Sequence, residues 1–292
     1  MDRLVITESP RDAIQGLHHF IPTDAKVRYI NDLLKVGFDI IDFGSFVSPK
    51  AIPQLADTAE VVKQLDLSGT GTRLMVITGN TRGAEMACRH EAITWLSFPF
   101  SVSETFLKRN INAGFDKGRM MIDEILNLSH KHRKELMVYL TMAFGNPYGD
   151  KWNPDMVWRW AEKLHAAGVS HFALSDITGE ATPERIALIY SVLKTDFQGR
   201  SFALHLHTTA DSWHDKVEAA WQNGCRHFDA VINGYGGCPM TGYELLGNLN
   251  TALLVEYAEK NDLDLKINKE SFHEATEKAA SFYSPGLGII SQ

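Results

Sequence analysis

Eight short runs rich in β-branched and aromatic residues alternate along the chain with eight longer amphipathic segments. This alternation limits the possible folds more than any other feature of the sequence. The expected strands are LVIT (4–7), FDIIDF (38–43), RLMVIT (73–78), AITWLSF (92–98), ELMVYL (135–140), HFALS (171–175), SFALHLH (201–207) and FDAVI (228–232). The expected helices lie near residues 24–36, 54–64, 82–89, 115–133, 153–167, 182–194, 211–223 and 247–260.

Eight strands that alternate with eight helices are typical of a TIM (β/α)8 barrel, an α/β fold. A doubly wound open sheet is the alternative, but it usually needs fewer strands, and no GxGxxG motif follows the first strand. We therefore predict one TIM-barrel domain over residues 1–292, with a C-terminal helical extension from about 262 to 292. In such a barrel the functional side chains lie at the carboxyl ends of the strands.

The composition argues against several classes of protein. The 292 residues carry a formal net charge of −7, which disfavours nucleic acid or an anionic membrane surface as the main partner. No apolar run approaches the roughly 18–20 residues of a membrane span. Met1 is followed almost at once by a strand-like run, and the three cysteines lack CxxC spacing, so we expect neither a targeting segment nor a disulfide scaffold. These features predict a reducing, cytoplasmic location.

Two pairs of histidines share the same spacing but differ in their expected geometry. His130 and His132 fall in a helix-like segment, where residues two apart point away from each other, so we expect them at the surface. His205 and His207 fall at the end of the seventh expected strand, where residues two apart share one face. The strand pair is either a metal site at the barrel mouth or two packed, hydrogen-bonded histidines, and spacing alone does not decide between them.

Other expected strand ends supply possible partners for these two histidines. They carry Arg11 and Asp12 after the first strand, Asp42 and Ser45 after the second, Asp176 and Thr178 after the sixth, and a glycine-rich loop with Cys238 leading to Asn248 after the eighth. An aspartate after a strand is also a common helix cap or turn residue, and for Asp176 and Thr178 that alternative stays open. Two imidazoles, a carboxylate and an amide oxygen at one face would suit Mg²⁺, Mn²⁺ or Zn²⁺.

Several longer motifs occur in a characteristic order. They are PRDAIQ, GSFVSPKAIPQLADTAEVV, FLKRNIN, GNPYG, HLH, GGCP and GNL. Together they resemble the 3-hydroxy-3-methylglutaryl-CoA lyase family, within the metal-dependent lyase and condensing-enzyme barrels. The resemblance runs from about residue 4 to about residue 280, and the SFVSPK and GGCP stretches are specific to the lyase branch.

The resemblance implies a TIM barrel with a divalent metal at its mouth. Mg²⁺ or Mn²⁺ is expected in preference to Zn²⁺. The implied metal ligands are Asp12, His205, His207 and Asn248; the implied catalytic residues are Arg11, Asp12, His205 and Cys238; the implied substrate-binding residues are Gln15, Asp42, Ser45 and Thr178. The implied reaction is retro-Claisen cleavage of a 3-hydroxy-3-carboxymethyl acyl-CoA, such as 3-hydroxy-3-methylglutaryl-CoA, into acetyl-CoA and a keto acid. A homodimer is expected, with a small-molecule acyl-CoA as substrate and neither nucleic acid nor membrane as partner.

Several positions depart from the family pattern. Ala13 stands where the RDG motif has glycine, and Asp42 and Thr7 stand where glutamates are common. Thr208 replaces the aspartate of HxHDT, and Asn146 replaces the cysteine of GCPYEG. Two alternatives therefore stay open: a condensing acyltransferase of the isopropylmalate or homocitrate synthase type, and a redirected homologue that acts on a different acyl-CoA or has lost its substrate.

Overall fold

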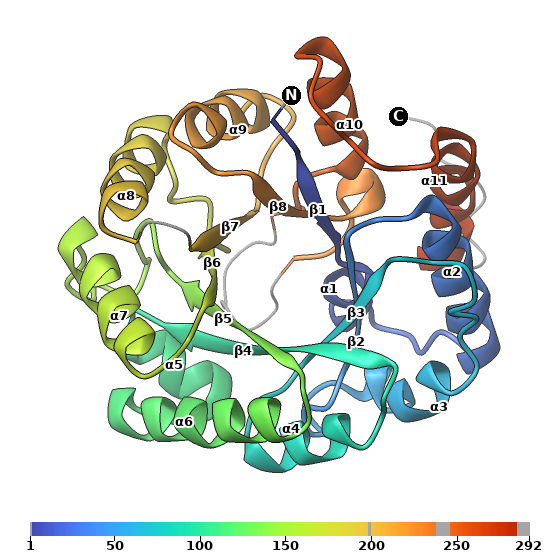
Figure 1. Ribbon diagram of the computed structural model, residues 1–292, viewed down its shortest axis with the longest axis horizontal. Helices are drawn as coiled ribbons and strands as arrows, with labels where there is room; N and C mark the ends of the chain where they lie inside the picture. The colour runs from blue at the N-terminus through green and yellow to red at the C-terminus, as the bar shows by residue number, and fades with distance from the viewer. Residues whose placement is uncertain (1, 198–199, 238–245, 285–292) are drawn as a thin grey trace.

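The computed structural model describes residues 2–197, 200–237 and 246–284. Eight parallel strands close into a barrel in the order of the sequence, from β1 round to β8 (Figure 1). The strands are β1 (Val5–Glu8), β2 (Ile40–Ser45), β3 (Arg73–Ile77), β4 (Ile93–Ser101), β5 (Glu135–Thr141), β6 (His171–Asp176), β7 (Ser201–Leu206) and β8 (His227–Ala230). The predicted TIM barrel is confirmed.

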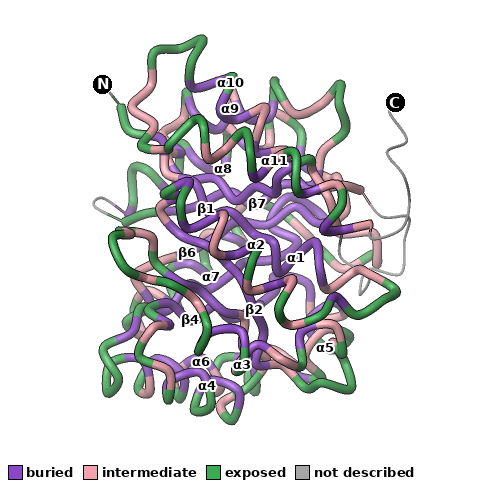
Figure 2. Tube along the Cα trace, turned by 90° about the vertical axis from the view of Figure 1, so that its right-hand side faces the viewer, coloured by how far each residue is buried: buried purple, intermediate pink, exposed green. Residues whose placement is uncertain are grey.

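Helices surround the barrel on its outside, and the barrel strands form the buried centre (Figure 2). The helices are α1 (Pro10–Gln15), α2 (Thr23–Val36), α3 (Thr58–Val62), α4 (Thr81–Cys88), α5 (Glu104–Ile111), α6 (Phe115–Lys131), α7 (Pro154–Ala166), α8 (Pro183–Asp196), α9 (Trp213–Gln222), α10 (Thr251–Lys260) and α11 (Lys269–Tyr283). Two short 3-10 turns are η1 (Pro53–Leu55) and η2 (Ile232–Gly234). None of the helices in the described part of the chain has the length and apolar character needed to span a membrane.

Two expected helices differ from those observed. The segment expected near 54–64 is divided into η1 and α3, because Asp57 breaks the helical conformation between them. The helix expected from residue 247 begins only at Thr251, because Asn248 and Asn250 form isolated β-bridges with His207 and Val231. The residues just before α10 are therefore paired like strands with the residues that follow β7 and β8, which places Asn248 beside the end of β7.

Inward-facing side chains divide the barrel interior into two levels. Ile40, Met75, Trp95, Met137, Tyr139, Ala173 and Ala203 form a separate buried cluster, and all of them except Tyr139 lie within the first three residues of their strands. Above it the strand register brings Thr7 opposite Asp229, Asp229 opposite His205, and His205 opposite Ser175. Apolar packing therefore fills the lower interior, and polar side chains gather near the carboxyl ends, where α/β barrels carry their active sites.

Candidate active site

Asp12, His205 and His207 converge at the carboxyl end of the barrel. One ligand atom from each of the three lies within 4.8 Å of the others, and all three residues are buried. The two histidine Nε2 atoms are 3.3 Å apart, and Asp12 Oδ2 lies 3.8 Å from His205 Nε2 and 3.9 Å from His207 Nε2. The histidine pair therefore faces a carboxylate, as in a metal site, and is not packed against apolar side chains alone.

The short helix α1 holds the Asp12 carboxylate in place. Asp12 Oδ1 accepts hydrogen bonds from Arg11 Nη1 at 2.7 Å and from Gln15 Nε2 at 2.5 Å. Asp12 Oδ2 is buried, and no group in the described residues forms a hydrogen bond with it. One oxygen is thus fixed by its own helix, while the other is directed at the two imidazoles without a partner. Most buried polar atoms in proteins have a hydrogen-bond partner, and a carboxylate oxygen that lacks one beside two imidazoles fits a site for a cation.

The protonation states of Asp12 and His207 are those that metal ligands require. Burial opposes ionisation of Asp12, but the positive charges of Arg11 and His205 lower the pKa of its carboxyl group to about 2. Burial, together with the charge of His205, lowers the pKa of His207 to about 4. At neutral pH Asp12 is therefore a carboxylate and His207 a neutral imidazole, and both can bind a cation without first losing a proton.

Asn248, the fourth expected ligand, lies beside this cluster. It pairs with His207 in an antiparallel β-bridge, and its side-chain Nδ2 donates a hydrogen bond to the Tyr235 carbonyl oxygen at 2.9 Å. The Asn248 side chain also contributes to the lowered pKa of Asp12. The structure thus brings the four expected ligands together at one end of the barrel.

Arg11 connects the cluster to a second buried carboxyl group. Its Nε and Nη2 atoms donate to Asp42 Oδ2 at 2.9 and 2.6 Å, while Nη1 donates to Asp12 and to Gln15 Oε1. Burial raises the pKa of Asp42 to about 6, against the opposing charge of Arg11. Asp42 has no exposed surface, so it acts on the site through the orientation of Arg11.

A third carboxylate, which the sequence analysis did not identify, holds His205. Asp229 Oδ2 lies 3.3 Å from His205 Nδ1 and accepts a hydrogen bond from the Tyr139 hydroxyl at 2.6 Å. Burial works against protonation of His205, but its bond to Asp229 and the charge of Asp12 raise the pKa of the imidazole. A carboxylate behind the second ring nitrogen is the usual way in which a metal-binding histidine is oriented.

The charges of this buried group are unbalanced without a cation. Asp12, Asp42 and Asp229 supply three carboxyl groups, and Arg11 supplies the one permanent positive charge among them. Buried charges in proteins are paired or coordinate metals. With all three carboxyl groups ionised and His205 neutral, as a metal-binding imidazole must be, a divalent cation would make the group neutral, and this balance fits the donor set of oxygen and imidazole ligands.

A cavity of about 400 Å³ opens directly onto the cluster. Arg11, Asp12 and His205 line it at the polar end, together with Gln15 and Tyr139. Its other walls include the apolar side chains Val47, Ala51, Ile52, Ile77, Phe106 and Ile111, with Arg109, Asn110 and Asn112 among the remaining lining residues. A pocket with one reactive polar end and apolar walls is typical of sites for small organic ligands.

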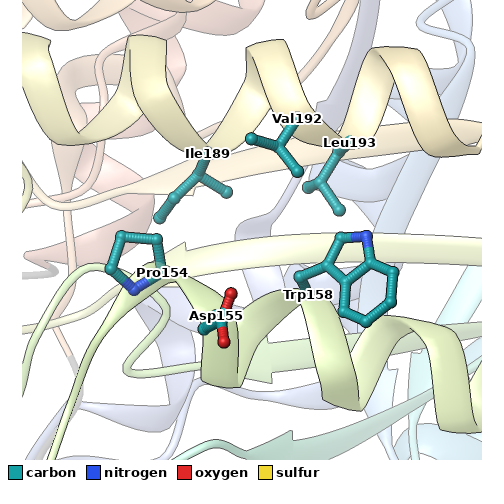
Figure 3. Close-up of a pocket in the computed structure, with 6 residues that line it drawn as sticks. All are labelled: Pro154, Asp155, Trp158, Ile189, Val192 and Leu193. Carbon is teal, nitrogen blue, oxygen red and sulfur yellow. The ribbon is translucent and has the colours of Figure 1, made fainter.

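A second hollow lies outside the barrel, between α7 and α8 (Figure 3). Its volume is about 50 Å³, and it is lined by Pro154, Asp155, Trp158, Ile189, Val192 and Leu193. This volume corresponds to a few water molecules, so the hollow is too small for an acyl-CoA.

The remaining residues expected at the site differ in whether they reach the cavity. Ser45 and Thr178 are absent from the residues that line the large cavity. The Ser45 hydroxyl accepts a hydrogen bond from the Val47 amide, and the Thr178 hydroxyl lies 4.0 Å from the Met142 sulfur atom. Asp176 accepts hydrogen bonds from the backbone amides of Glu180 and Ala181, so it has the turn-forming contacts that the sequence analysis left open. Cys238 lies outside the described residues.

Three departures from the family pattern have structural partners of their own. Ala13 packs under the glycine-rich loop, because a Cβ atom on Gly236 would lie 2.8 Å from the Ala13 Cα atom. The Asn146 side chain accepts from the Tyr148 and Asp150 amides and donates to the Asp150 carbonyl oxygen. Thr208 donates its amide hydrogen to the Gly247 carbonyl oxygen. Each of these residues therefore supports a loop around the barrel mouth.

Comparison with known proteins agrees with this geometry. The HMGL-like family model matches residues 4–278. The chain belongs to the HMGL-like family.

Relatives of this HMGL-like protein carry a consistent name. The hydroxymethylglutaryl-CoA lyase of Bacillus subtilis is 31% identical over 271 residues, which cover 92% of this chain and 89% of the relative. The mitochondrial hydroxymethylglutaryl-CoA lyase of Bos taurus is 30% identical, with 93% of this chain and 82% of the relative covered. In each case the match extends over most of both proteins. The similarity to these carbon–carbon lyases therefore covers the whole barrel domain.

A solved structure extends the comparison to the fold. The structure of an HMG-CoA lyase from Acinetobacter baumannii in complex with coenzyme A and 3-methylmalate matches with a TM-score of 0.90 at 29% identity, and the match covers 97% of this chain and 92% of that chain. The HMGL-like protein therefore has the same barrel as an enzyme that has been observed with a coenzyme A ligand.

Proposed function

We propose that this protein is a divalent-metal-dependent carbon–carbon lyase that cleaves a 3-hydroxy-3-carboxymethyl acyl-CoA, such as 3-hydroxy-3-methylglutaryl-CoA, to acetyl-CoA and a keto acid. The observation that carries the proposal is the unpartnered Asp12 Oδ2, which faces His205 and His207 at the end of a cavity of about 400 Å³. The named lyase relatives support the substrate class.

Four residues would hold the metal: Asp12, His205, His207 and Asn248. The unpartnered carboxylate oxygen and the charge imbalance of the buried group both fit a divalent cation. When bound, such an ion acts as a Lewis acid that lowers the pKa of a substrate hydroxyl group and orients it. Mg²⁺ or Mn²⁺ suits the mixed oxygen and nitrogen donors, and Zn²⁺ is a further candidate.

The residues of the chain provide the proton transfers and the charge stabilisation. Cleavage breaks the C2–C3 bond of the substrate: the C3 hydroxyl proton leaves, C3 becomes a ketone carbon, and the bond electrons pass to C2 as a thioester enolate. Asp12 or His205 accepts the hydroxyl proton, since both lie at the end of the cavity. Arg11, which is permanently charged and also lines the cavity, stabilises the enolate oxygen, and Cys238 returns a proton to C2.

The remaining expectations extend this proposal. We propose that residues 1–292 act as one domain with α11 as its extension, that the protein works in the cytoplasm, and that it forms a homodimer. Sedimentation velocity would check the oligomeric state. The condensing acyltransferase is disfavoured, because the relatives that match over most of their length are named lyases.

The direct test is to incubate the protein with Mg²⁺ or Mn²⁺ and 3-hydroxy-3-methylglutaryl-CoA and to measure acetoacetate and acetyl-CoA. We expect equal amounts of both products, no products after chelation with EDTA, and none from the His207→Gln variant. If products appear only with a different 3-hydroxy acyl-CoA, the redirected homologue is correct. If none appear with any such compound or metal, the lyase proposal fails.

A further inference from the structure

Glu8 is a buried carboxyl group that the proposed mechanism does not use. It is the last residue of β1 and has no exposed surface. Thr7, directly before it, points into the barrel, where its hydroxyl group lies 2.7 Å from His227 Nε2. Because side chains alternate along a strand, Glu8 points to the outer face, away from the substrate cavity. Its role must therefore be sought among the elements packed behind β1.

The two carboxyl oxygens of Glu8 bond to two residues that are distant from each other in sequence. Oε1 accepts a hydrogen bond from the Ile232 amide at 2.8 Å, and Oε2 accepts one from the Thr251 hydroxyl at 2.6 Å. Ile232 follows β8, which pairs with β1 (Figure 1), and Thr251 is the first residue of α10. Glu8 thus joins the two ends of the chain segment 233–250, which contains Asn248.

The contacts next to Glu8 continue directly to Asn248. The Val231 amide donates to the Leu249 carbonyl oxygen at 2.9 Å, and the Thr251 amide donates to the Val231 carbonyl oxygen at 3.2 Å. The Leu249 amide in turn donates to the Leu206 carbonyl oxygen, at the end of β7, at 3.0 Å. Asn248 therefore lies in a backbone ladder with Leu206 and His207 on one side and the chain joined by Glu8 on the other.

Burying a carboxyl group costs free energy unless hydrogen bonds replace those that it makes with water. Burial also raises the pKa of Glu8 to about 8, despite its bonds to Thr251 and Ile232, so the group is mostly neutral at pH 7. In the neutral group the carbonyl oxygen accepts from the Ile232 amide, the acid O–H and the Thr251 hydroxyl group share the second hydrogen bond, and no unpaired charge lies behind the metal ligands. We propose that Glu8 is a positioning residue that holds Asn248 in place for metal binding by joining Ile232 to Thr251. This inference rests on the proposed function, because it takes Asn248 as a metal ligand.

Mn²⁺ titration without substrate and hydrogen exchange of the 231–251 backbone test this role in the full-length protein. Glu8→Val removes both hydrogen bonds, so we expect the Mn²⁺ dissociation constant to rise about tenfold or more, as for other residues that orient metal ligands. The Ile232, Leu249 and Thr251 amides should exchange faster. Glu8→Gln has nearly the same shape and keeps a carbonyl oxygen and a second polar atom, so it should restore both measurements to within about threefold of the wild type.

Ile122→Ala, in the buried face of α6, is the matched control for a general loss of stability. It should lower the melting temperature but leave the Mn²⁺ affinity and the exchange of residues 231–251 unchanged. If Glu8→Val does not fold, Thr251→Val replaces it, because that variant removes one of the two bonds and keeps Glu8. The inference about Glu8 would be overturned, and the proposed function left intact, if the Glu8 or Thr251 variant kept the Mn²⁺ affinity of the wild type. The same would follow if Ile122→Ala lost as much Mn²⁺ affinity as that variant. A wild-type protein that binds no divalent metal would overturn the proposed function as well.

Discussion

Arg11 shows how one side chain can serve both the structure and the chemistry of this site. A guanidinium group has five N–H donors. Four hydrogen bonds from Arg11 reach Asp12, Gln15 and Asp42, and they fix its plane at the polar end of the cavity. We propose that the remaining N–H donor on Nη2, held by these bonds, stabilises the thioester oxygen as it becomes negatively charged. Such prior orientation is what makes a donor effective in a transition state.

Arg11→Lys should therefore lower kcat about 10²–10³-fold, because lysine keeps the charge but loses the planar donor set. KM should change little, since a donor that acts on the enolate contributes to the transition state and not to substrate binding. Steady-state kinetics with 3-hydroxy-3-methylglutaryl-CoA would measure the changes in kcat and in KM separately. The exposed Arg159→Lys variant in α7 is the control and should match the wild type. A raised KM with unchanged kcat would show that Arg11 only anchors the substrate.

Residue types at strand ends predicted part of this site, and the remaining part depended on strand register. Asp12, His205 and His207 were identified because they follow or end expected strands, where barrels carry their chemistry. Asp229 and Tyr139 lie within strands, and only the pairing of His205 with Asp229 and the closure of the barrel bring them to the imidazole. A charged residue inside an expected apolar strand was the one sequence signal for Asp229.

At the scale of elements, the strands were predicted more accurately than the short helices. Every expected strand overlaps an observed one, because alternation of β-rich and amphipathic runs is a repeated signal. The helices α1 and α5, of 6 and 8 residues, were not expected from the sequence. The position of α1 is nevertheless decisive, because it carries both Arg11 and Asp12.

The buried end of β1 gives a prediction about pH. Burial raises the pKa of Glu8 from 4.5 to about 8, so the folded protein holds this proton more tightly than the unfolded chain. Between these two values the folded state binds more protons, and the contribution of Glu8 to stability falls as pH rises. Glu8→Gln cannot ionise. The melting temperature of Glu8→Gln minus that of the wild type should therefore increase from about pH 5 to pH 8 and then remain constant.

Thermal unfolding of both proteins in matched buffers would measure this difference. Other titrating groups are common to the two proteins, so their effects cancel in the subtraction. A difference that does not vary with pH would mean that Glu8 is not buried as a neutral acid.

At the scale of the whole molecule, the barrel explains why residues far apart in sequence act together. The eight strands are parallel and close in sequence order, so the segments after β1, β2, β7 and β8 meet at one rim. Asp42 and His205 lie in β2 and β7 themselves, and Asp12 and His207 follow β1 and β7, although 195 residues separate Asp12 from His207. The fold class therefore predicted which end of the barrel would be functional, whereas the detailed contacts required the three-dimensional register.

The same convergence couples metal binding to the stability of the whole barrel. The candidate ligands come from α1, β7 and the segments after β7 and β8, and the unfolded chain does not hold them together. A ligand that binds only the folded state at 100 times its dissociation constant stabilises that state by about 2.7 kcal/mol. With an unfolding entropy of about 2.1 cal/mol/K per residue over 292 residues, Mn²⁺ should raise the melting temperature by about 4 °C. Scanning calorimetry with and without Mn²⁺ would measure the shift, and His207→Gln should show none. An equal shift in His207→Gln would place the bound metal elsewhere on the protein and contradict the site proposed for it.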